Sequence, residues 1–175
     1  MKENWQHAFD TVIESEGGYK LTTLQGDAGG QTYAGIARVP NPNWEGWAVI
    51  DKGETPSKEM VMHFYKSHIW DKVHGDDLPT GLDYLVYDFA VNAGPGQSAK
   101  LLQRAVGVTD DGAIGNGTLA AVNAHNATDV IEKFTKQKEA FYDAIVAKRP
   151  ENGRFLKGWL NRVAHSKGIA ETMVG

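Results

Sequence analysis

The sequence predicts a mainly α fold, a single globular domain of about seven helices with one small β-hairpin or loop region. Two observations carry this prediction. Apolar residues recur at intervals of three and four along most of the chain, which is the spacing of one helical face. Alternating patterns are short and lie in one stretch rich in Gly, Thr, Asn and Pro. The 175 residues fit one domain with its own core.

The first expected helix covers residues 3–16, and Gly17 and Gly18 end it. Its apolar residues share one helical face: Trp5, Ala8, Phe9, Val12 and Ile13. Residues 19–56 are expected to form loops and one small hairpin, because Gly and Pro interrupt each short alternation there.

Helices dominate the rest of the chain. Pro56 and Ser57 mark the start of a helix that runs to about residue 70. Residues 81–93 are apolar on two faces, which is typical of a helix central in its domain. Pro95 is well placed to begin the next helix. Three further helices are expected over residues 118–124, 128–148 and 154–173.

Charge and cysteine content exclude several classes of protein. Lys and Arg number 18 and Asp and Glu 22, a formal net charge of −4, which argues against nucleic acid as a partner. Without cysteine, no disulfide, thiolate nucleophile or zinc–thiolate site can form. The start, MKENWQHAFD, lacks the apolar run of a signal peptide, and no later stretch reaches membrane-spanning length. We therefore expect synthesis in the cytoplasm and no stable membrane insertion.

The two glutamates of IESEGGY should differ in environment. At about 100° per residue, Glu16 continues the apolar stripe of Val12 and Ile13 toward the core, whereas Glu14 faces water. Partial burial and the negative end of the helix dipole both favour the protonated carboxyl of Glu16, as a general acid requires. A Glu followed by two glycines most often marks only the end of a helix and has no catalytic role.

A downstream segment strengthens the catalytic interpretation. GDAGGQTYAGIA supplies a second carboxylate, Asp27, and a hydroxyl, Thr32, in a glycine-rich stretch that could fold back against Glu16. One buried acid, one acid in a polar loop and a hydroxyl able to hold water together indicate a glycosidase.

Four motifs in order resemble the peptidoglycan-degrading muramidases of glycoside hydrolase family 108, found as phage endolysins and as bacterial or prophage "secretion activator" proteins. They are VIESEGGY (12–19), GDAGGQTYAGIA (26–37), DFAVNAGPGQSAKLLQRAVG (88–107) and FLKGWLNRV (155–163). The resemblance implies a lysozyme-like fold, Glu16 as catalytic acid and peptidoglycan glycan strands as partner. The implied reaction is hydrolysis of the β-1,4 bond between N-acetylmuramic acid and N-acetylglucosamine.

The same segments look like phage lysozymes with a Glu, Asp and Thr triad. Ten residues separate Glu16 from Asp27 and four separate Asp27 from Thr32, which is close to the triad spacing but not identical. Asp27 and Thr32 are therefore assigned as supporting catalytic residues that position water or act electrostatically. The segment 38–53, RVPNPNWEGWAVIDKG, departs from the family in its Trp and Pro content, so a different substrate-groove loop is expected.

Residues 101–124 resemble a predicted peptidoglycan-binding segment that accompanies the family, although a helix, turn and helix packed in the core explain them equally well. We expect a lysozyme-like catalytic region over 1–95 and a helical region resembling the binding segment over 96–175, packed in the same globule.

Substrate contacts are assigned to Tyr19, Tyr33, Gln31 and Asn92. The two tyrosines are expected in loops that flank the catalytic segment, where their rings could stack on sugars. Asn92 could point into the groove or, equally, cap its own helix. The histidines show no metal-ligand spacing and no EF-hand loop occurs, so neither metal nor cofactor is expected.

Two other functions fit the same residues. A lytic transglycosylase also needs one acidic Glu but releases an anhydro sugar, and an inactive peptidoglycan-binding protein would need no acid. We expect a monomer that acts on the cell wall, in the periplasm, after holin-type or other release.

Overall fold

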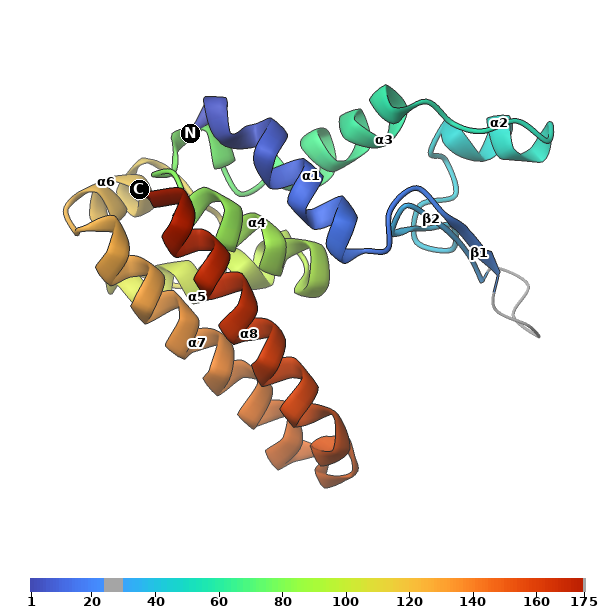
Figure 1. Cartoon of the computed structure of the whole chain (residues 1–175). Coiled ribbons are helices and arrows are strands. Elements are labelled where there is room, and N and C mark those ends of the chain that lie inside the picture. The colour runs from blue at the N-terminus through green and yellow to red at the C-terminus, as the bar shows by residue number, and fades with distance from the viewer. Residues whose placement is uncertain (24–29, 175) are drawn as a thin grey trace. The chain divides into compact units, whose positions relative to one another are not determined.

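The computed structural model describes residues 1–23 and 30–174, and these form a mainly α-helical fold with one small antiparallel sheet, as predicted. The chain divides into two compact units. We call Gln6–His68 the hairpin unit, and Met1–Trp5 together with Ile69–Gly175 the helical unit. Figure 1 shows the course of the chain and the labels used below. The predicted division after residue 95 stays a prediction.

The hairpin unit holds the sheet and the first three helices. Its elements are α1 (Trp5–Ser15, which starts one residue before the unit), β1 (Leu21–Thr23), β2 (Gln31–Tyr33), β3 (Ile36–Ala37), α2 (Gly46–Asp51) and α3 (Lys58–Tyr65). A π-helical segment, Lys66–Trp70, extends α3. The Ser57 hydroxyl accepts a hydrogen bond from the N–H of Met60 at 3.2 Å and so caps α3 where the sequence predicts its start.

The sheet has the order β1-β2-β3 with antiparallel neighbours. Thr32 stands opposite Thr22 on one side and Ala37 on the other. A two-residue turn, Ala34 and Gly35, joins β2 to β3 with φ values of 50° and 82°. Two successive positive φ values are the mark of a type I′ turn, which matches the twist of a hairpin. The expected small hairpin is therefore present.

The helix α2 was not expected, because residues 19–56 were assigned to loops and a hairpin. Its six residues include Gly46 and the β-branched Val49 and Ile50, which lower the local helix propensity. Tertiary contacts of Trp47 stabilise the helix instead. Its side chain is only 2% exposed, and its indole N–H donates a hydrogen bond to the Asn41 carbonyl at 2.8 Å. The described residues thus contain eight α-helices, one more than the sequence predicts.

The helical unit is built from five helices. They are α4 (Leu82–Ala93), α5 (Pro95–Val106), α6 (Asn116–Asn123), α7 (Ala127–Lys148) and α8 (Gly153–Val174). The two longest, α7 and α8, run side by side as a hairpin, and α4 and α5 pack against them (Figure 1). Every residue from Leu82 to Ala90 is buried, so α4 is the central helix that its two apolar faces predict.

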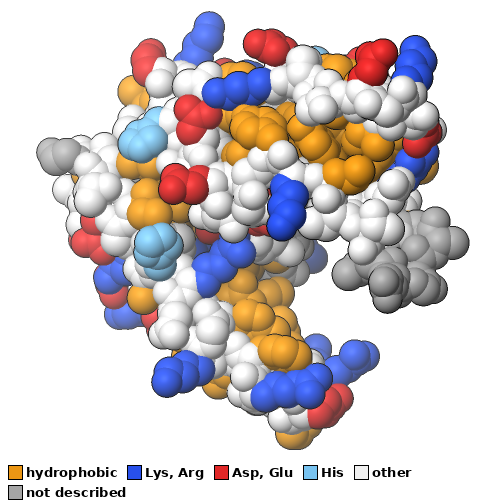
Figure 2. Space-filling view, turned by 45° about the vertical axis from the view of Figure 1, so that its right-hand side comes forward, with side chains coloured by type: hydrophobic (Ala, Val, Ile, Leu, Met, Phe, Trp, Pro, Cys, Tyr) orange, Lys and Arg blue, Asp and Glu red, His pale blue; other side chains and the backbone are white. Residues whose placement is uncertain are grey.

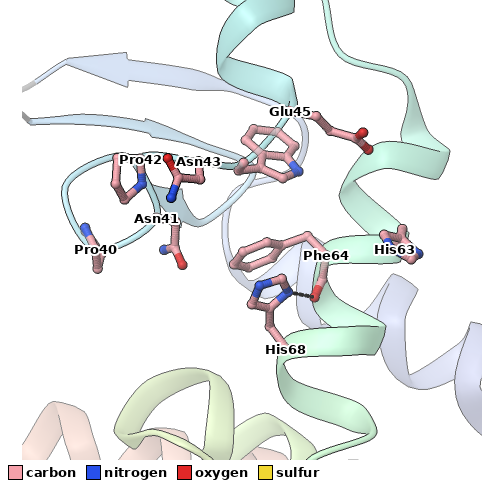
Figure 3. A pocket seen from close by; sticks show the side chains of 9 residues that line it. Pro40, Asn41, Pro42, Asn43, Glu45, His63, Phe64 and His68 are labelled. Carbon is pink, nitrogen blue, oxygen red and sulfur yellow. Dashed lines mark hydrogen bonds between the residues drawn. The ribbon is translucent and has the colours of Figure 1, made fainter.

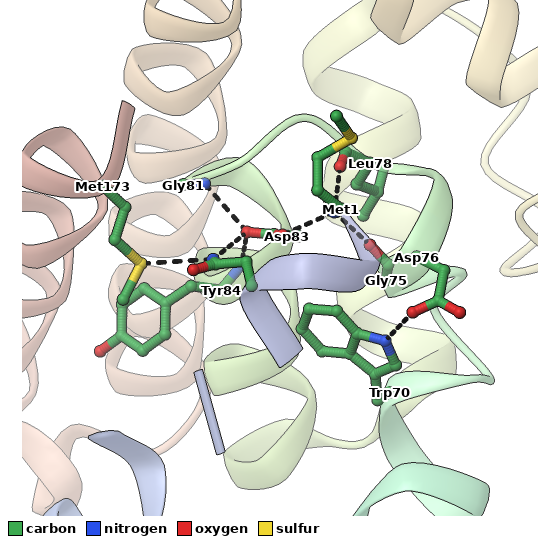
Figure 4. A network of polar contacts seen from close by, with 10 residues as sticks. Met1, Trp70, Gly75, Asp76, Leu78, Gly81, Asp83, Tyr84 and Met173 are labelled. Carbon is green, nitrogen blue, oxygen red and sulfur yellow. Dashed lines mark hydrogen bonds and ion pairs between the residues drawn. The ribbon is translucent and has the colours of Figure 1, made fainter. Parts of the chain in front are cut away.

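A buried carboxylate, Asp83, organises the start of α4 (Figure 4). It accepts hydrogen bonds from the backbone N–H groups of Gly81 and Tyr84 and from the Asn4 amide at 2.6–2.9 Å. The amino group of Met1 lies 2.6 Å from its second oxygen. Both oxygens of this fully buried carboxylate therefore have donors, as a buried charge requires.

A second buried polar group lies between α4, α7 and α8. Lys138 is 2% exposed, donates to the Ser166 hydroxyl at 3.0 Å and lies near the rings of Phe89 and Phe134. Burial lowers the pKa of Lys138 to about 8, against the opposing effect of the Asp88 charge. Burial likewise raises the pKa of Asp88. For both side chains, the loss of hydration on burial therefore changes the pKa more than the nearby opposite charges do.

Candidate active site

Glu16 stands where α1 ends. Its N–H still donates to the Val12 carbonyl at 2.9 Å, so the residue completes the last helical turn. Gly17 and Gly18 follow with φ values of 90° and 79°, a conformation that side chains other than glycine rarely adopt. Glu16 is half-buried and Glu14 is exposed, as the helical spacing predicts.

The β2–β3 turn packs against Glu16. A Cβ atom built on Gly35 would lie 3.3 Å from both Cβ and Cγ of Glu16, and it would overlap the hydroxyl of Tyr65. That hydroxyl is buried and donates to the Ala34 carbonyl at 2.6 Å. Burial raises the pKa of Tyr65 well above its ordinary value, and the Glu16 charge adds to the shift. The end of α1, the turn and α3 therefore meet at one carboxyl group.

Thr32 lies in β2, half-buried, directly before the strand residue that leads into this turn. Successive strand residues point to opposite faces, so its side chain and that of Tyr33 lie on different sides of the sheet. Thr32 is thus placed on the same short hairpin whose turn contacts Glu16. Its catalytic role stays a prediction.

Two of the predicted substrate contacts are engaged within the protein. Tyr33 lies in a strand and not in a loop, is 4% exposed and stacks on Trp44 with ring centroids 6.1 Å apart. The side-chain amide oxygen of Gln31 accepts a hydrogen bond from the Arg38 guanidinium at 2.6 Å, and Arg38 also donates two bonds to Asp51 at 2.8 and 2.9 Å. These contacts tie the hairpin to α2. Sugar binding by either residue stays a prediction.

The remaining predicted residues fall in three different places. Tyr19 follows the glycines and is 42% exposed, so its ring is open to a ligand. Asp27 lies outside the described residues. Asn92 is exposed in the last turn of α4 and belongs to the helical unit. Its expected place in the catalytic groove stays a prediction.

An open pocket of about 510 Å³ lies within the hairpin unit (Figure 3). One wall is the loop Pro40–Glu45, part of the Trp- and Pro-rich segment that departs from the family pattern. The opposite wall carries His63, Phe64 and His68, and the last two rings stack 4.4 Å apart. Glu16 and Thr32 are not among its described lining residues. Trp44 connects the pocket to the sheet, because it lines the pocket and stacks on Tyr33.

Sequence reasoning missed two partners of Glu16, namely Tyr65 and Gly35. Tyr65 had a signal in its helical spacing on α3, but that spacing indicates a core aromatic as readily as a site residue. Within the described residues, no group of three or more His, Asp or Glu side chains could hold a metal ion. No helix of the described chain is long and apolar enough to cross a membrane.

Comparisons with known proteins agree with this arrangement. The model of the glycosyl hydrolase 108 family matches residues 9–94, and that of a predicted peptidoglycan domain matches residues 97–164. No curated protein matches the chain significantly. Among solved structures, SagA of Brucella abortus is similar, with 31% identity over 99% of this chain and 97% of its own, and a TM-score of 0.77. The resemblance read from the sequence is confirmed: the chain belongs to the glycosyl hydrolase 108 family, carries the predicted peptidoglycan domain and is a glycosidase that degrades peptidoglycan.

Proposed function

We propose that this glycosidase is an N-acetylmuramidase of the lysozyme type, which hydrolyses the β-1,4 bond between N-acetylmuramic acid and N-acetylglucosamine. The observation that carries the proposal is the setting of Glu16. It is a half-buried carboxyl at a helix end, packed against the Gly35 turn and close to the buried Tyr65. Such a group is sheltered from water on one side and open to substrate on the other, as a general acid must be.

In the proposed reaction, Glu16 in its acid form donates a proton to the glycosidic oxygen. The bond between this oxygen and C1 of N-acetylmuramic acid breaks, and the N-acetylglucosamine end leaves as an alcohol. A water held by Thr32 and Asp27 then adds to C1 and passes its proton to the Asp27 carboxylate, and exchange with solvent returns a proton to Glu16. The acetamido group of the substrate could replace that water as the first nucleophile, with water completing the reaction afterwards.

The test compares Glu16→Gln with wild type on purified Gram-negative peptidoglycan, and the released fragments are weighed by mass spectrometry. The substitution keeps the shape and removes the proton, so release should fall by at least about a hundredfold, the contribution typical of a general acid. Glu14→Gln, an exposed change two residues away in the chain, is the matched control and should retain full activity.

The product masses separate the competing functions. Reducing fragments carrying one added water support a muramidase. Anhydro fragments would keep Glu16 as the acid but change the reaction to a lytic transglycosylase. Full activity of Glu16→Gln would refute its role, and sedimentation with cell walls without any cleavage would leave only a binding protein.

The proposed setting is that of an endolysin of phage type, made in the cytoplasm and acting on the periplasmic cell wall after holin-type or other release. The motifs of the first region support this proposal, since similar motifs occur in phage endolysins. We propose that the chain works as a monomer. Light scattering during gel filtration, with the mass of one chain as the expected result, tests this point.

A further inference from the structure

The helical unit contains a second hollow, of about 400 Å³, where the end of α4 and the start of α5 meet the α7–α8 hairpin. Its main lining side chains are of two kinds, aromatic rings and hydrogen-bonding groups. They are Phe141, Tyr142 and Trp159, with Asn92, Gln97 and Arg162. All of them belong to the helical unit, so the hollow is complete within one compact part of the chain.

The aromatic rings here differ from those of the core. Phe141, Tyr142 and Trp159 are all partly exposed, whereas Phe89 and Phe134 beneath them are at most 1% exposed. Tyr142 and Trp159 stack with centroids 5.1 Å apart and 26° between their planes. Figure 2 shows hydrophobic side chains open to the surface along this hairpin. Partly exposed aromatic clusters beside polar groups are a usual feature of ligand sites.

The polar groups at the hollow are suited to neutral, hydroxyl-rich ligands. The side-chain amides of Asn92 and Gln97 make no hydrogen bond within the described residues, so both retain donors and an acceptor. Arg162 lies 3.7 Å from the buried carboxylate of Asp88, which steadies its guanidinium from below. Aromatic rings cover the apolar face of a sugar, while amides and a guanidinium bond its acetamido and hydroxyl groups.

We propose that this hollow binds the N-acetylated glycan strand of peptidoglycan at a place separate in sequence from the Glu16 site. Residues 97–164 match a predicted peptidoglycan domain, and for this reason we choose peptidoglycan as the ligand. Five of the six side chains named above fall inside that range. Residues 101–124, which resemble a predicted peptidoglycan-binding segment, are not among the described residues that line the hollow. The inference concerns binding alone and does not depend on Glu16 being the catalytic acid.

The test uses the full chain carrying Glu16→Gln, which the proposed mechanism makes inactive, and mass spectrometry of the strands after the titration checks that they are intact. Peptide-free glycan strands from amidase-treated peptidoglycan are titrated into labelled protein and followed by NMR. The backbone N–H groups of residues 92–94, 96, 97, 141–145 and 159–162 and the indole N–H of Trp159 should shift together. A separate titration with free stem peptide should leave them unmoved.

Variants give the second readout. Trp159→Ala should weaken strand binding at this place about tenfold, the loss typical of a buried aromatic contact. Gln97→Ala should weaken it about threefold and is a small change in the first turns of α5 that leaves the core intact. Gln137→Ala, a half-buried glutamine on α7 outside the hollow, is the matched control and should bind normally.

Three results would overturn the proposal. They are strand titration without shifts at these amides, equal binding by the Gln97→Ala and Gln137→Ala proteins, and shifts caused by stem peptide but not by glycan. Cleavage by wild type without shifts at the hollow would reject this inference and keep the muramidase. Shifts at the hollow without cleavage by wild type would support glycan binding there and reject the proposed muramidase activity.

Discussion

Gly35 lies against the side chain of Glu16, since a Cβ atom built on Gly35 would stand 3.3 Å from both Cβ and Cγ of Glu16, and the Tyr65 hydroxyl beside them leaves no room for a methyl group. The contact follows from the positive φ of Gly35 and from the Tyr65 hydroxyl, which holds the carbonyl of Ala34. The turn between β2 and β3, which has no room for a Cβ atom at Gly35, therefore packs against one side of the proposed catalytic acid.

Gly35→Ala should reduce both stability and activity. A methyl group would overlap the Tyr65 hydroxyl and press on Glu16, and alanine at φ 82° adds strain of its own. We expect a loss of roughly 2 kcal/mol or more in the free energy of unfolding, measured with urea. Cleavage of peptidoglycan by the fraction that remains folded should also fall, because the Glu16 carboxyl must move.

Gly53→Ala is the matched control for this change. Gly53 has almost the same φ, 80°, but nothing lies within 4 Å of the site of its missing Cβ. It therefore reports backbone strain alone, and its activity should equal that of wild type. Equal losses of activity in the two variants would show that the contact with Glu16 has no functional importance.

Thr32→Val should lower cleavage with little effect on folding. The change keeps the shape of the side chain and its preference for strands but removes the hydroxyl proposed to hold water. We expect kcat to fall by roughly a hundredfold. Thr22 stands directly opposite Thr32 in the sheet, so Thr22→Val tests the same substitution on the neighbouring strand and should leave kcat unchanged. Unchanged kcat for Thr32→Val would remove Thr32 from the proposed mechanism.

Periodicity predicts elements that are organised by their own sequence. The stripe of α1 places Glu16 toward the interior, and the two apolar faces of α4 place it at the centre of the helical unit. Periodicity does not predict α2, because this helix depends on the burial of Trp47. There the tertiary contact decides the structure, and no local pattern carries that information.

Site residues follow the same rule. Glu16 could be found from its own helix, but Gly35, which packs against it, and Tyr65, whose pKa its charge raises, lie 19 and 49 positions further along the chain. Tyr33 was expected in a loop that flanks the catalytic segment, whereas pairing with Ile36 and stacking on Trp44 place it in a buried strand. Contacts between distant segments are settled by packing, which a single sequence does not display.

Buried Lys138 should make stability rise with pH between about 8 and 10. Its pKa is about 8 in the folded chain and about 10.4 when unfolded. Between these values the unfolded state holds a proton that the folded state has released, so raising the pH favours folding. Below pH 8 both states are protonated, and the cost of burying the charge is constant. Above pH 10 the buried Tyr65 and Tyr84 oppose the trend, because burial raises their pKa.

Urea unfolding of wild type and Lys138→Met at pH 7.5, 8.5 and 9.5 measures this effect. Methionine fills similar space beside Phe89 and Phe134 and does not titrate. The free energy of unfolding of wild type minus that of the variant should therefore increase with pH, by up to about 1.4 kcal/mol per unit. Lys136→Met, an exposed change on the same helix, should give a curve parallel to wild type. A constant difference between wild type and Lys138→Met would mean that the lysine keeps its charge when buried, held by Asp88, and that the charge pair outweighs the loss of hydration.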